Sequence, residues 1–195
     1  MIYQILYLCG LLFAEGLRFQ QRRRHQQEFR EQAAAGKRIQ WQEKLTLLLL
    51  LLGMWVLPIV FTFTNWLSFA DYGLPRWVST TGLLIFAGGL WLRWRAQRDL
   101  GRSWSSTLVI WQEHHLITDG IYHYIRHPLY AAQLLWAFSQ ALLLHNWFAG
   151  LGGLAAVLPL VVLRMPREEE MMLAQFGDAY REYMRRSGRI FPKMS

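Results

Sequence analysis

The chain has 195 residues, of which 53% are hydrophobic and 15% aromatic, whereas only 17% are charged. Ordinary soluble domains carry about 25% charged residues, so this composition excludes a disordered chain, and the length suits a single domain. Cys9 is the only cysteine, which excludes an internal disulfide and a cysteine-built metal site. Because the apolar residues are grouped in long blocks, the composition points to contact with lipid.

The apolar blocks predict an all-α, integral membrane protein with about five transmembrane helices. A helix needs about 17 to 25 mostly apolar residues to cross about 30 Å of hydrocarbon. The expected transmembrane helices lie near residues 1–17, 45–66, 77–95, 128–145 and 147–164, and a cytoplasmic helix is expected over 166–187. The first block lacks the basic start and the cleavage site of a signal peptide, so we interpret it as a retained helix.

The net charge of +8 is unevenly distributed, and this predicts the orientation of the chain. Lys and Arg are concentrated in the segments 18–44, 93–126 and 164–193, and only Arg76 falls in an opposite loop. Five crossings place all three basic segments on one side, which should be the cytoplasm. The basic residues are then a topology signal that contacts lipid headgroups, and we expect no nucleic-acid partner because no recognition motif accompanies them. The short connection His145-Asn146 predicts a hairpin of the last two transmembrane helices.

Four histidines, His114, His115, His123 and His127, lie together in the second basic segment and raise the alternative of a metal site. Pro128 disfavours helical geometry at His127, and no helix with acidic ligands accompanies the histidines. We therefore expect no metal.

The segment around Pro128 offers a candidate anion site. Pro128 suits the first turn of a helix, whose free amides and dipole favour an anionic group, with Arg126 and His127 as extra donors. The alternative is that Arg126 only marks the membrane boundary.

A second polar group, from Arg164 to Glu170, follows the last apolar block. Pro166 is expected to start a new helix, and acidic residues in a first turn are favoured by the helix dipole, so Glu168, Glu169 and Glu170 could serve as caps. The alternative is that one carboxylate binds a cationic or amino-bearing ligand while Arg164 receives an anion. Both interpretations stay open on the residues alone.

Several elements occur in an order that resembles the isoprenylcysteine carboxyl methyltransferase family and, more distantly, the membrane phospholipid methyltransferases. They are Leu100-Gly101-Arg102-Ser103-Trp104, the run His114 to Tyr122, Arg126-His127-Pro128-Leu129-Tyr130, Arg164, Glu168-Glu169, Phe176-Gly177, Tyr180 and Tyr183. The chain departs from the family pattern at Ala132, where glycine is usual, and at Met172, where leucine is usual. Residues 1 to about 75 match in hydropathy alone, so the resemblance covers the second half of the chain.

The resemblance implies methyl transfer from S-adenosyl-L-methionine, which leaves S-adenosyl-L-homocysteine, to the carboxylate of a C-terminal S-prenylated cysteine. It places Arg164, and as a second candidate Arg126, at the substrate carboxylate. The residues that it implies for the cofactor are His114, His115, Leu116, Ile117, Tyr122, His127, Pro128, Leu129, Tyr130 and Glu169. Glu170 leaves the register of the glutamate pair open by one residue.

A carboxylate acceptor with an ordinary pKa near 3.5 is already ionised at neutral pH, so its attack needs no general base. Catalysis then depends on alignment, which can supply about 7 to 11 kcal/mol. The prenyl chain is expected to enter from the bilayer and the cofactor from the cytoplasm, in the cell membrane of a prokaryote or the endoplasmic reticulum of a eukaryote. The alternatives are a phospholipid or other lipophilic amine as acceptor, a nicotinamide-dependent membrane reductase, and a non-enzymatic membrane scaffold; the oligomeric state is open.

Overall fold

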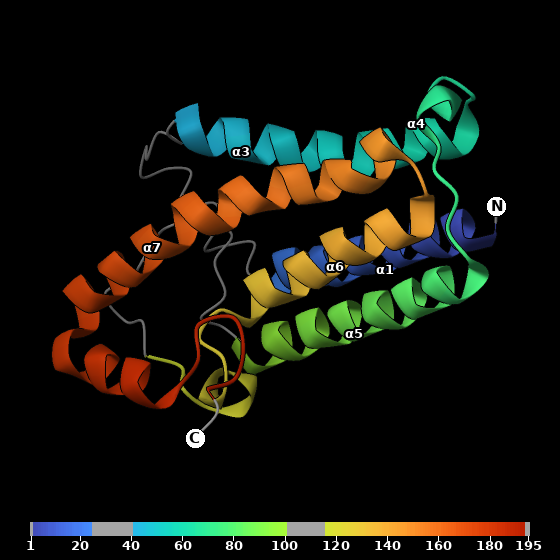
Figure 1. Cartoon of the computed structure of the whole chain (residues 1–195). Coiled ribbons are helices and arrows are strands. Elements are labelled where there is room, and N and C mark those ends of the chain that lie inside the picture. The colour runs from blue at the N-terminus through green and yellow to red at the C-terminus, as the bar shows by residue number, and fades with distance from the viewer. Residues whose placement is uncertain (1, 25–40, 101–115, 194–195) are drawn as a thin grey trace.

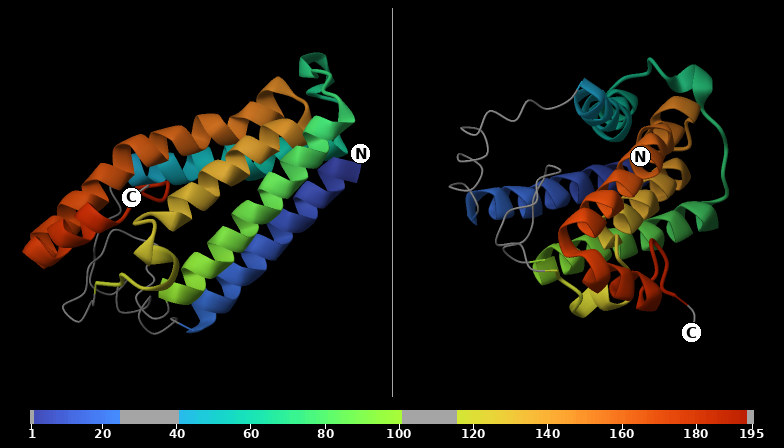
Figure 2. Two further views of the ribbon diagram at one scale, coloured as in Figure 1. Left: turned by 60° about the horizontal axis from the view of Figure 1, so that its bottom comes forward. Right: turned by 90° about the vertical axis from the view of Figure 1, so that its left-hand side faces the viewer.

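The computed structural model describes residues 2–24, 41–100 and 116–193, and this part of the chain forms a bundle of long helices (Figures 1 and 2). The elements are α1 (Ile2–Arg24), α3 (Trp41–Leu51), the π-helix η1 (Leu52–Val56), α4 (Leu57–Phe63), the 3-10 turn η2 (Ser68–Ala70), α5 (Arg76–Leu100), the 3-10 turn η4 (Gly120–His123), α6 (Pro128–Leu144) and α7 (Trp147–Arg186). The predicted all-α class is confirmed.

Helix α6 lies at the centre of the bundle. It packs against α5 and α7, while α1 packs against α5 and α6, and the run α3, η1 and α4 lies along α7. The rings of Tyr7 and Phe86 stack at a centroid distance of 5.2 Å, and Phe86 meets Trp136 edge-on at 5.6 Å. These aromatic contacts join α1, α5 and α6 in one core, to which α7 adds Val157 and Met165.

The connection between α6 and α7 is a tight turn. His145 adopts the left-handed conformation with φ of 52° and ends α6. Asn146 then caps α7, because its side-chain oxygen accepts hydrogen bonds from the amides of Phe148 and Ala149 at 3.0 and 2.9 Å. Since the turn leaves no room for a longer path, α6 and α7 run antiparallel as a hairpin (Figure 1).

The helix expected over 45–66 is interrupted by the π-helix η1, which directly precedes Pro58. In the π register the amide of Leu57 donates to Leu52, but Pro58 has no N–H to offer the carbonyl of Gly53. The side-chain nitrogen of Gln140, on α6, donates to that carbonyl at 2.8 Å. A buried side chain from another helix therefore satisfies the carbonyl that the proline leaves open.

Helix α7 corrects one prediction. We expected Pro166 to separate a span over 147–164 from a helix over 166–187, but α7 is continuous from Trp147 to Arg186 with Pro159 and Pro166 inside it. Pro166 removes one intrahelical hydrogen bond, yet α7 continues through it, and Met165 and Glu169 on either side are buried. The backbone instead departs from helical geometry at Gly177, with φ of 51° and ψ of −122°, and the last part of α7 turns there (Figure 1).

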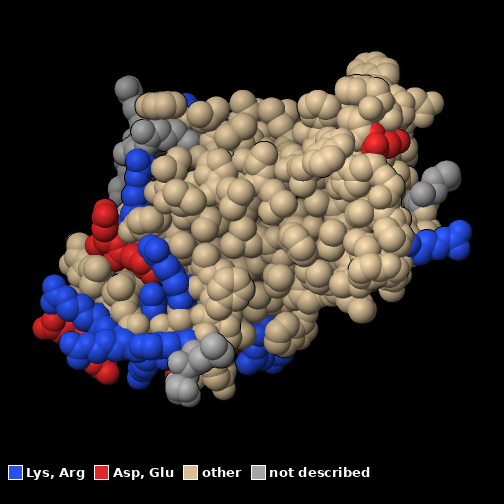
Figure 3. Space-filling view, in the orientation of Figure 1, with Lys and Arg blue, Asp and Glu red and all other residues tan. Residues whose placement is uncertain are grey.

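Two helices of the described residues are long and apolar enough to cross a membrane, namely Lys44–Phe63 and Trp147–Arg186. Ile2–Gly16 and Pro128–Leu144 are shorter apolar helices. Only 17% of the most apolar window of Lys44–Phe63 is buried inside the bundle, so most of its leucines face outward. Charged side chains gather at the end of the bundle where α7 ends, while the middle of the visible face carries none (Figure 3).

Candidate active site

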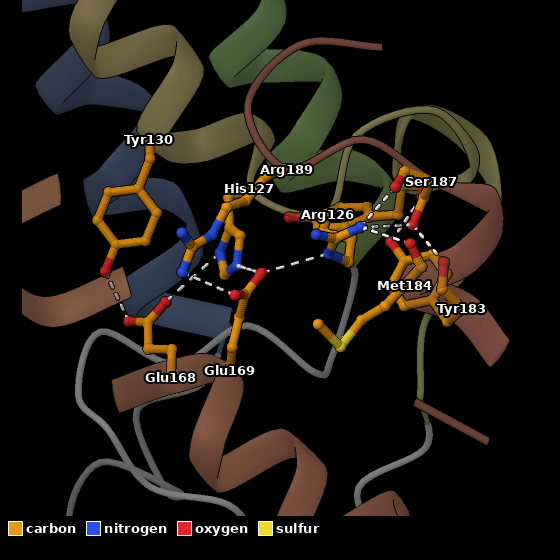
Figure 4. Close-up of polar contacts among 10 residues, drawn as sticks. Arg126, His127, Tyr130, Glu168, Glu169, Tyr183, Met184, Ser187 and Arg189 are labelled. Atoms are coloured by element: carbon orange, nitrogen blue, oxygen red, sulfur yellow. Dashed lines mark hydrogen bonds and ion pairs between the residues drawn. The ribbon is translucent and has the colours of Figure 1, made fainter. Parts of the chain in front are cut away.

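The candidate site lies at the charged end of the bundle, where three segments meet (Figure 4). The first runs from Arg126 into the first turn of α6 at Tyr130, and the second is the part of α7 from Arg164 to Glu169. The third is the chain directly after α7, from Ser187 to Arg189. Hydrogen bonds and ion pairs link all three segments, so the site is built from residues more than 60 positions apart.

Glu169 is the centre of this site, and its side chain is only 10% exposed. Its oxygen Oε1 accepts from Nε of Arg126 at 3.3 Å and from Nε2 of His127 at 3.2 Å. Its other oxygen, Oε2, lies 2.7 Å from a guanidinium nitrogen of Arg189. Both carboxylate oxygens are therefore engaged by partners within the protein.

These partners keep Glu169 ionised. Burial by itself would raise the pKa of this carboxyl, because it disfavours the charged form. The hydrogen bond from His127 and the positive charges of His127, Arg189 and Arg126 outweigh burial and lower the pKa from 4.5 to about 2. At neutral pH Glu169 is an acceptor that holds three donors.

Glu168 occupies the opposite side of His127 and is more open, with 24% of its side chain exposed. Its Oε1 accepts from the hydroxyl of Tyr130 at 2.7 Å and from Nε of Arg164 at 3.1 Å. Its Oε2 lies 3.8 Å from Nδ1 of His127. Glu168 and Glu169 both contact residues of the site, whereas Glu170 is exposed.

Arg126 is bound to the protein's own C-terminal segment. Its Nη1 donates to the carbonyls of Met184 and Ser187, at 3.1 Å in the case of Met184, in addition to the bond from Nε to Glu169. The side chains of Arg126 and His127, expected as extra donors to an anion, both meet an internal carboxylate, that of Glu169. Of the two arginines predicted to hold a substrate carboxylate, Arg164 lies beside the more open Glu168.

The segment after α7 forms a strap, defined here as Ser187–Arg189, that pairs with the chain leading into α6. The amides of Arg126 and His127 donate to the carbonyls of Gly188 and Arg189 at 2.8 and 3.0 Å, and the amide of Gly188 donates to Tyr124 at 2.9 Å. The backbone amides of the two residues that precede Pro128 are therefore paired with the strap. Sequence analysis missed the strap, because a serine and a glycine after a helix indicate only a stop.

Two buried tyrosines, Tyr122 and Tyr183, lie next to the site and are hydrogen-bonded to each other. Tyr122 is buried, and the hydroxyl of Tyr183 donates to its backbone carbonyl at 2.6 Å. Burial, with the nearby Tyr183, Asp99 and Glu168, raises the pKa of Tyr122. Burial also raises the pKa of Tyr183, to about 12, against the lowering effect of Arg126, so both phenols are neutral and serve as rigid supports.

The other predicted residues are distributed as follows. Pro128 is buried at the first position of α6, and Leu116, Ile117 and Leu129 are half-buried. His114 and His115 lie outside the described residues. His123 is exposed and packs against Tyr124 at a ring distance of 5.0 Å, and no group of three metal-binding side chains occurs within the ranges that the structure describes.

The fold and the site together define a class of protein. It is an all-α protein with long apolar helices and a charged site between helices at one end of the bundle. Residues 80–174, which include most of α5, all of α6 and most of the site, match the isoprenylcysteine carboxyl methyltransferase (ICMT) family. Over this range the chain is similar to the family.

Relatives of known function agree with the family. The chain is 33% identical over 112 residues to protein-S-isoprenylcysteine O-methyltransferase B of Arabidopsis thaliana, which covers 56% of this chain and 57% of the relative. It is 32% identical over 114 residues to the Homo sapiens protein-S-isoprenylcysteine O-methyltransferase, which covers 56% of this chain and 39% of the relative. These alignments span about half the length of the curated relatives or less.

A solved structure has a similar fold. The eukaryotic intramembrane Ras methyltransferase ICMT superposes with a TM-score of 0.55 at 24% identity, over 79% of this chain and 54% of that chain. The likeness supports the helical architecture.

Proposed function

We propose that this protein is an integral membrane methyltransferase that methylates the carboxylate of a C-terminal S-prenylated cysteine or a similar lipophilic carboxylate, with S-adenosyl-L-methionine as methyl donor. The observation that carries the proposal is the constellation of Glu168, His127, Tyr130 and Arg164 inside the range that matches the family. Its curated relatives from Arabidopsis and human are named for this reaction.

The proposed arrangement has five spans, formed by α1, by α3 to α4, by α5, by α6 and by the first part of α7, with the charged end in the cytoplasm. The support is the exposure of leucines along α3, such as Leu47, Leu48 and Leu51, which water would not tolerate as a continuous face. The basic residues after α7, among them Arg181 and Arg185, lie at the same end as the site.

The residues present fit the proposed cofactor. S-adenosyl-L-methionine combines a zwitterionic amino acid end and a sulfonium cation with an apolar adenine, so its site needs both charged partners and apolar walls. Glu168 and the hydroxyl of Tyr130 offer a partly open carboxylate and a polar group for the cationic end. Leu116, Ile117 and Leu129, all half-buried, would border the adenosine.

We assign the reaction to alignment by the protein. When bound, the cofactor supplies an electrophilic methyl group, and the acceptor carboxylate is ionised at neutral pH, so no side chain has to remove a proton. Arg164 would orient the acceptor, and its bond to Glu168 would couple the acceptor side to the cofactor side. Apolar helices around the site would exclude water, which strengthens these charge interactions.

The test is methyl transfer from labelled S-adenosyl-L-methionine to two acceptors in detergent: N-acetyl-S-geranylgeranyl-cysteine and phosphatidylethanolamine. We expect an alkali-labile methyl ester on the first acceptor and no label on the second. Arg164→Lys should reduce transfer at least tenfold by raising KM for the acceptor, while Arg181→Ala, at an exposed ion pair with Asp178, should keep wild-type activity.

An alkali-stable methyl group on the phospholipid would show that the methyl acceptor is an amine and not a carboxylate. Absence of both products, together with no binding of S-adenosyl-L-homocysteine to folded protein, would overturn the methyltransferase proposal.

A further inference from the structure

The strap Ser187–Arg189 carries a cation into the centre of the site. The guanidinium of Arg189 lies 2.7 Å from Oε2 of Glu169. This distance is shorter than those from Glu169 to Arg126 and His127. The side chain of Arg189 is 42% exposed, whereas that of Glu169 is 10% exposed. Arg189 thus reaches from the surface to a buried carboxylate, and Figure 4 places it beside His127.

The two oxygens of Glu169 have different partners. Oε1 is shared by Arg126 and His127, while Oε2 is held by Arg189. Removal of Arg189 would leave a buried carboxylate oxygen without this donor, and the carboxylate would then turn toward its remaining partners. The orientation of the His127 ring depends on where Oε1 lies, so it depends on Arg189.

His127 connects this cluster with the side of the site assigned to the ligand. Its Nε2 edge bonds to Glu169 and its Nδ1 edge lies 3.8 Å from Glu168. Glu168 in turn bonds to Tyr130 and Arg164. A single path of contacts therefore runs from Arg189, through Glu169 and His127, to the groups that would meet cofactor and acceptor.

The backbone of the strap holds Arg189 in place for this role. The carbonyl of Arg189 accepts from the amide of His127 at 3.0 Å, and Gly188 exchanges two hydrogen bonds with Tyr124 and Arg126. Gly188 lies so close to the carbonyl oxygen of Phe191 that no side chain fits there. Because the backbone of Arg189 bonds to His127 and its side chain bonds to Glu169, the strap is part of the site.

We propose that Arg189 is a positioning residue of the cofactor site, which acts through Glu169 to fix the ring of His127 between the two glutamates. This inference rests on the proposed function for its binding readout. It adds a residue outside the range 80–174 that matches the family.

The first test is a double-mutant cycle of S-adenosyl-L-homocysteine affinity, measured by calorimetry on the full chain with Arg189→Gln, Glu169→Gln and the double variant. We expect about tenfold weaker binding for each single variant and no further loss in the double variant, because both act through one contact. Arg189→Lys should restore most of the affinity. Arg185→Gln is the matched control, since it removes the same charge at an exposed pair with Glu182 and should change affinity less than twofold.

The second test needs no ligand. In protein labelled with ¹⁵N-histidine, Arg189→Gln should shift the Nε2 and Nδ1 signals of His127, assigned with His127→Gln, whereas Arg185→Gln should leave them unchanged. Thermal unfolding confirms that each variant is folded, and Arg189→Met replaces Arg189→Gln in this test if Arg189→Gln does not fold.

Failure of the wild type to bind S-adenosyl-L-homocysteine would count against the proposed function, while the histidine signals would still decide the role of Arg189. Unchanged His127 signals in a folded Arg189→Gln, additive losses in the double variant, or an equal effect of Arg185→Gln would overturn the inference.

Discussion

The carboxylate Oε1 of Glu169 lies 3.2 Å from Nε2 of His127, although the two residues stand 42 positions apart and belong to α7 and the start of α6. This contact joins the two polar motifs of the sequence into one site. Arg126 and Arg189 complete the coordination of the carboxylate, and all four groups lie at the charged end of the bundle. The chemistry of the site therefore depends on how closely α6 and α7 approach each other there.

Glu169→Gln should weaken the binding of S-adenosyl-L-homocysteine at least tenfold, about 1.4 kcal/mol. The amide removes the charge that holds Arg126, His127 and Arg189, so the ring of His127 loses its fixed orientation. Calorimetric titration of the purified protein measures the effect. Glu170→Gln removes the same charge one position along at an exposed side chain and should bind as the wild type does; equal losses in both variants would contradict the assignment.

The stability of the protein should fall in acid because of Glu169. Its pKa is lowered to about 2 in the folded state from an ordinary 4.5, so its stabilising contribution is complete above about pH 4.5 and disappears as the pH falls toward about 2. The unfolding temperature of the wild type, followed from pH 6 to pH 3, should drop more steeply than that of Glu169→Gln. Parallel curves for the two proteins would show that Glu169 is not the titrating group.

Gln140→Leu should destabilise the protein by about 2 to 4 kcal/mol, since buried polar groups that lose their partners cost about 1 to 3 kcal/mol each. The side chain of Gln140 donates to the carbonyls of Gly53 and Ala149 and accepts from the hydroxyl of Tyr7 at 2.6 Å. Thermal or denaturant unfolding in detergent measures the loss. Gln133→Leu is the control on the same helix, where the amide makes one weak contact with the sulfur of Met54, and its effect should be much smaller.

Gly177→Ala should destabilise α7 by about 1 to 3 kcal/mol, the cost of a non-glycine residue in a sparsely populated backbone region. Gly177 has φ of 51° and ψ of −122°, and a Cβ atom there would meet nothing within 4 Å, so the cost comes from the backbone alone. Gly16→Ala is the matched control, because Gly16 is helical with equally open surroundings and alanine there should stabilise by about 0.5 to 1 kcal/mol. Unfolding temperatures of the two variants should move in opposite directions.

The motifs around Arg126 and Arg164 could be found from sequence because each is a continuous run of residues with a recognisable chemistry. Their combination in a fixed order also led to the family, which the comparisons confirm. The sequence did not show how the environments of the two carboxylates differ. Glu168 and Glu169 are neighbours of identical chemistry, and only the packing of α7 against α6 makes Glu169 buried and fully paired while Glu168 stays partly open.

The boundary expected at Pro166 failed for a physical reason of the same kind. Proline propensity is a local property, and an interior proline costs about 3 kcal/mol. Helix α7 nevertheless continues through Pro166, where Met165 and Glu169 on either side are buried. The change of direction occurs instead at Gly177, whose positive φ suits a glycine.

Hydropathy, net charge and helix signals by themselves determined the helical class, the apolar blocks and the basic segments, because these properties depend on neighbouring residues. Only the tertiary structure decided which polar groups meet. The amide of Gln140 reaches Gly53 across 87 positions, and Arg189 reaches Glu169 from a strap after the last helix. Such pairs combine residues from separate helices, and the energy that selects them is the cost of leaving a buried donor or acceptor unpaired, which exists only once the helices have packed.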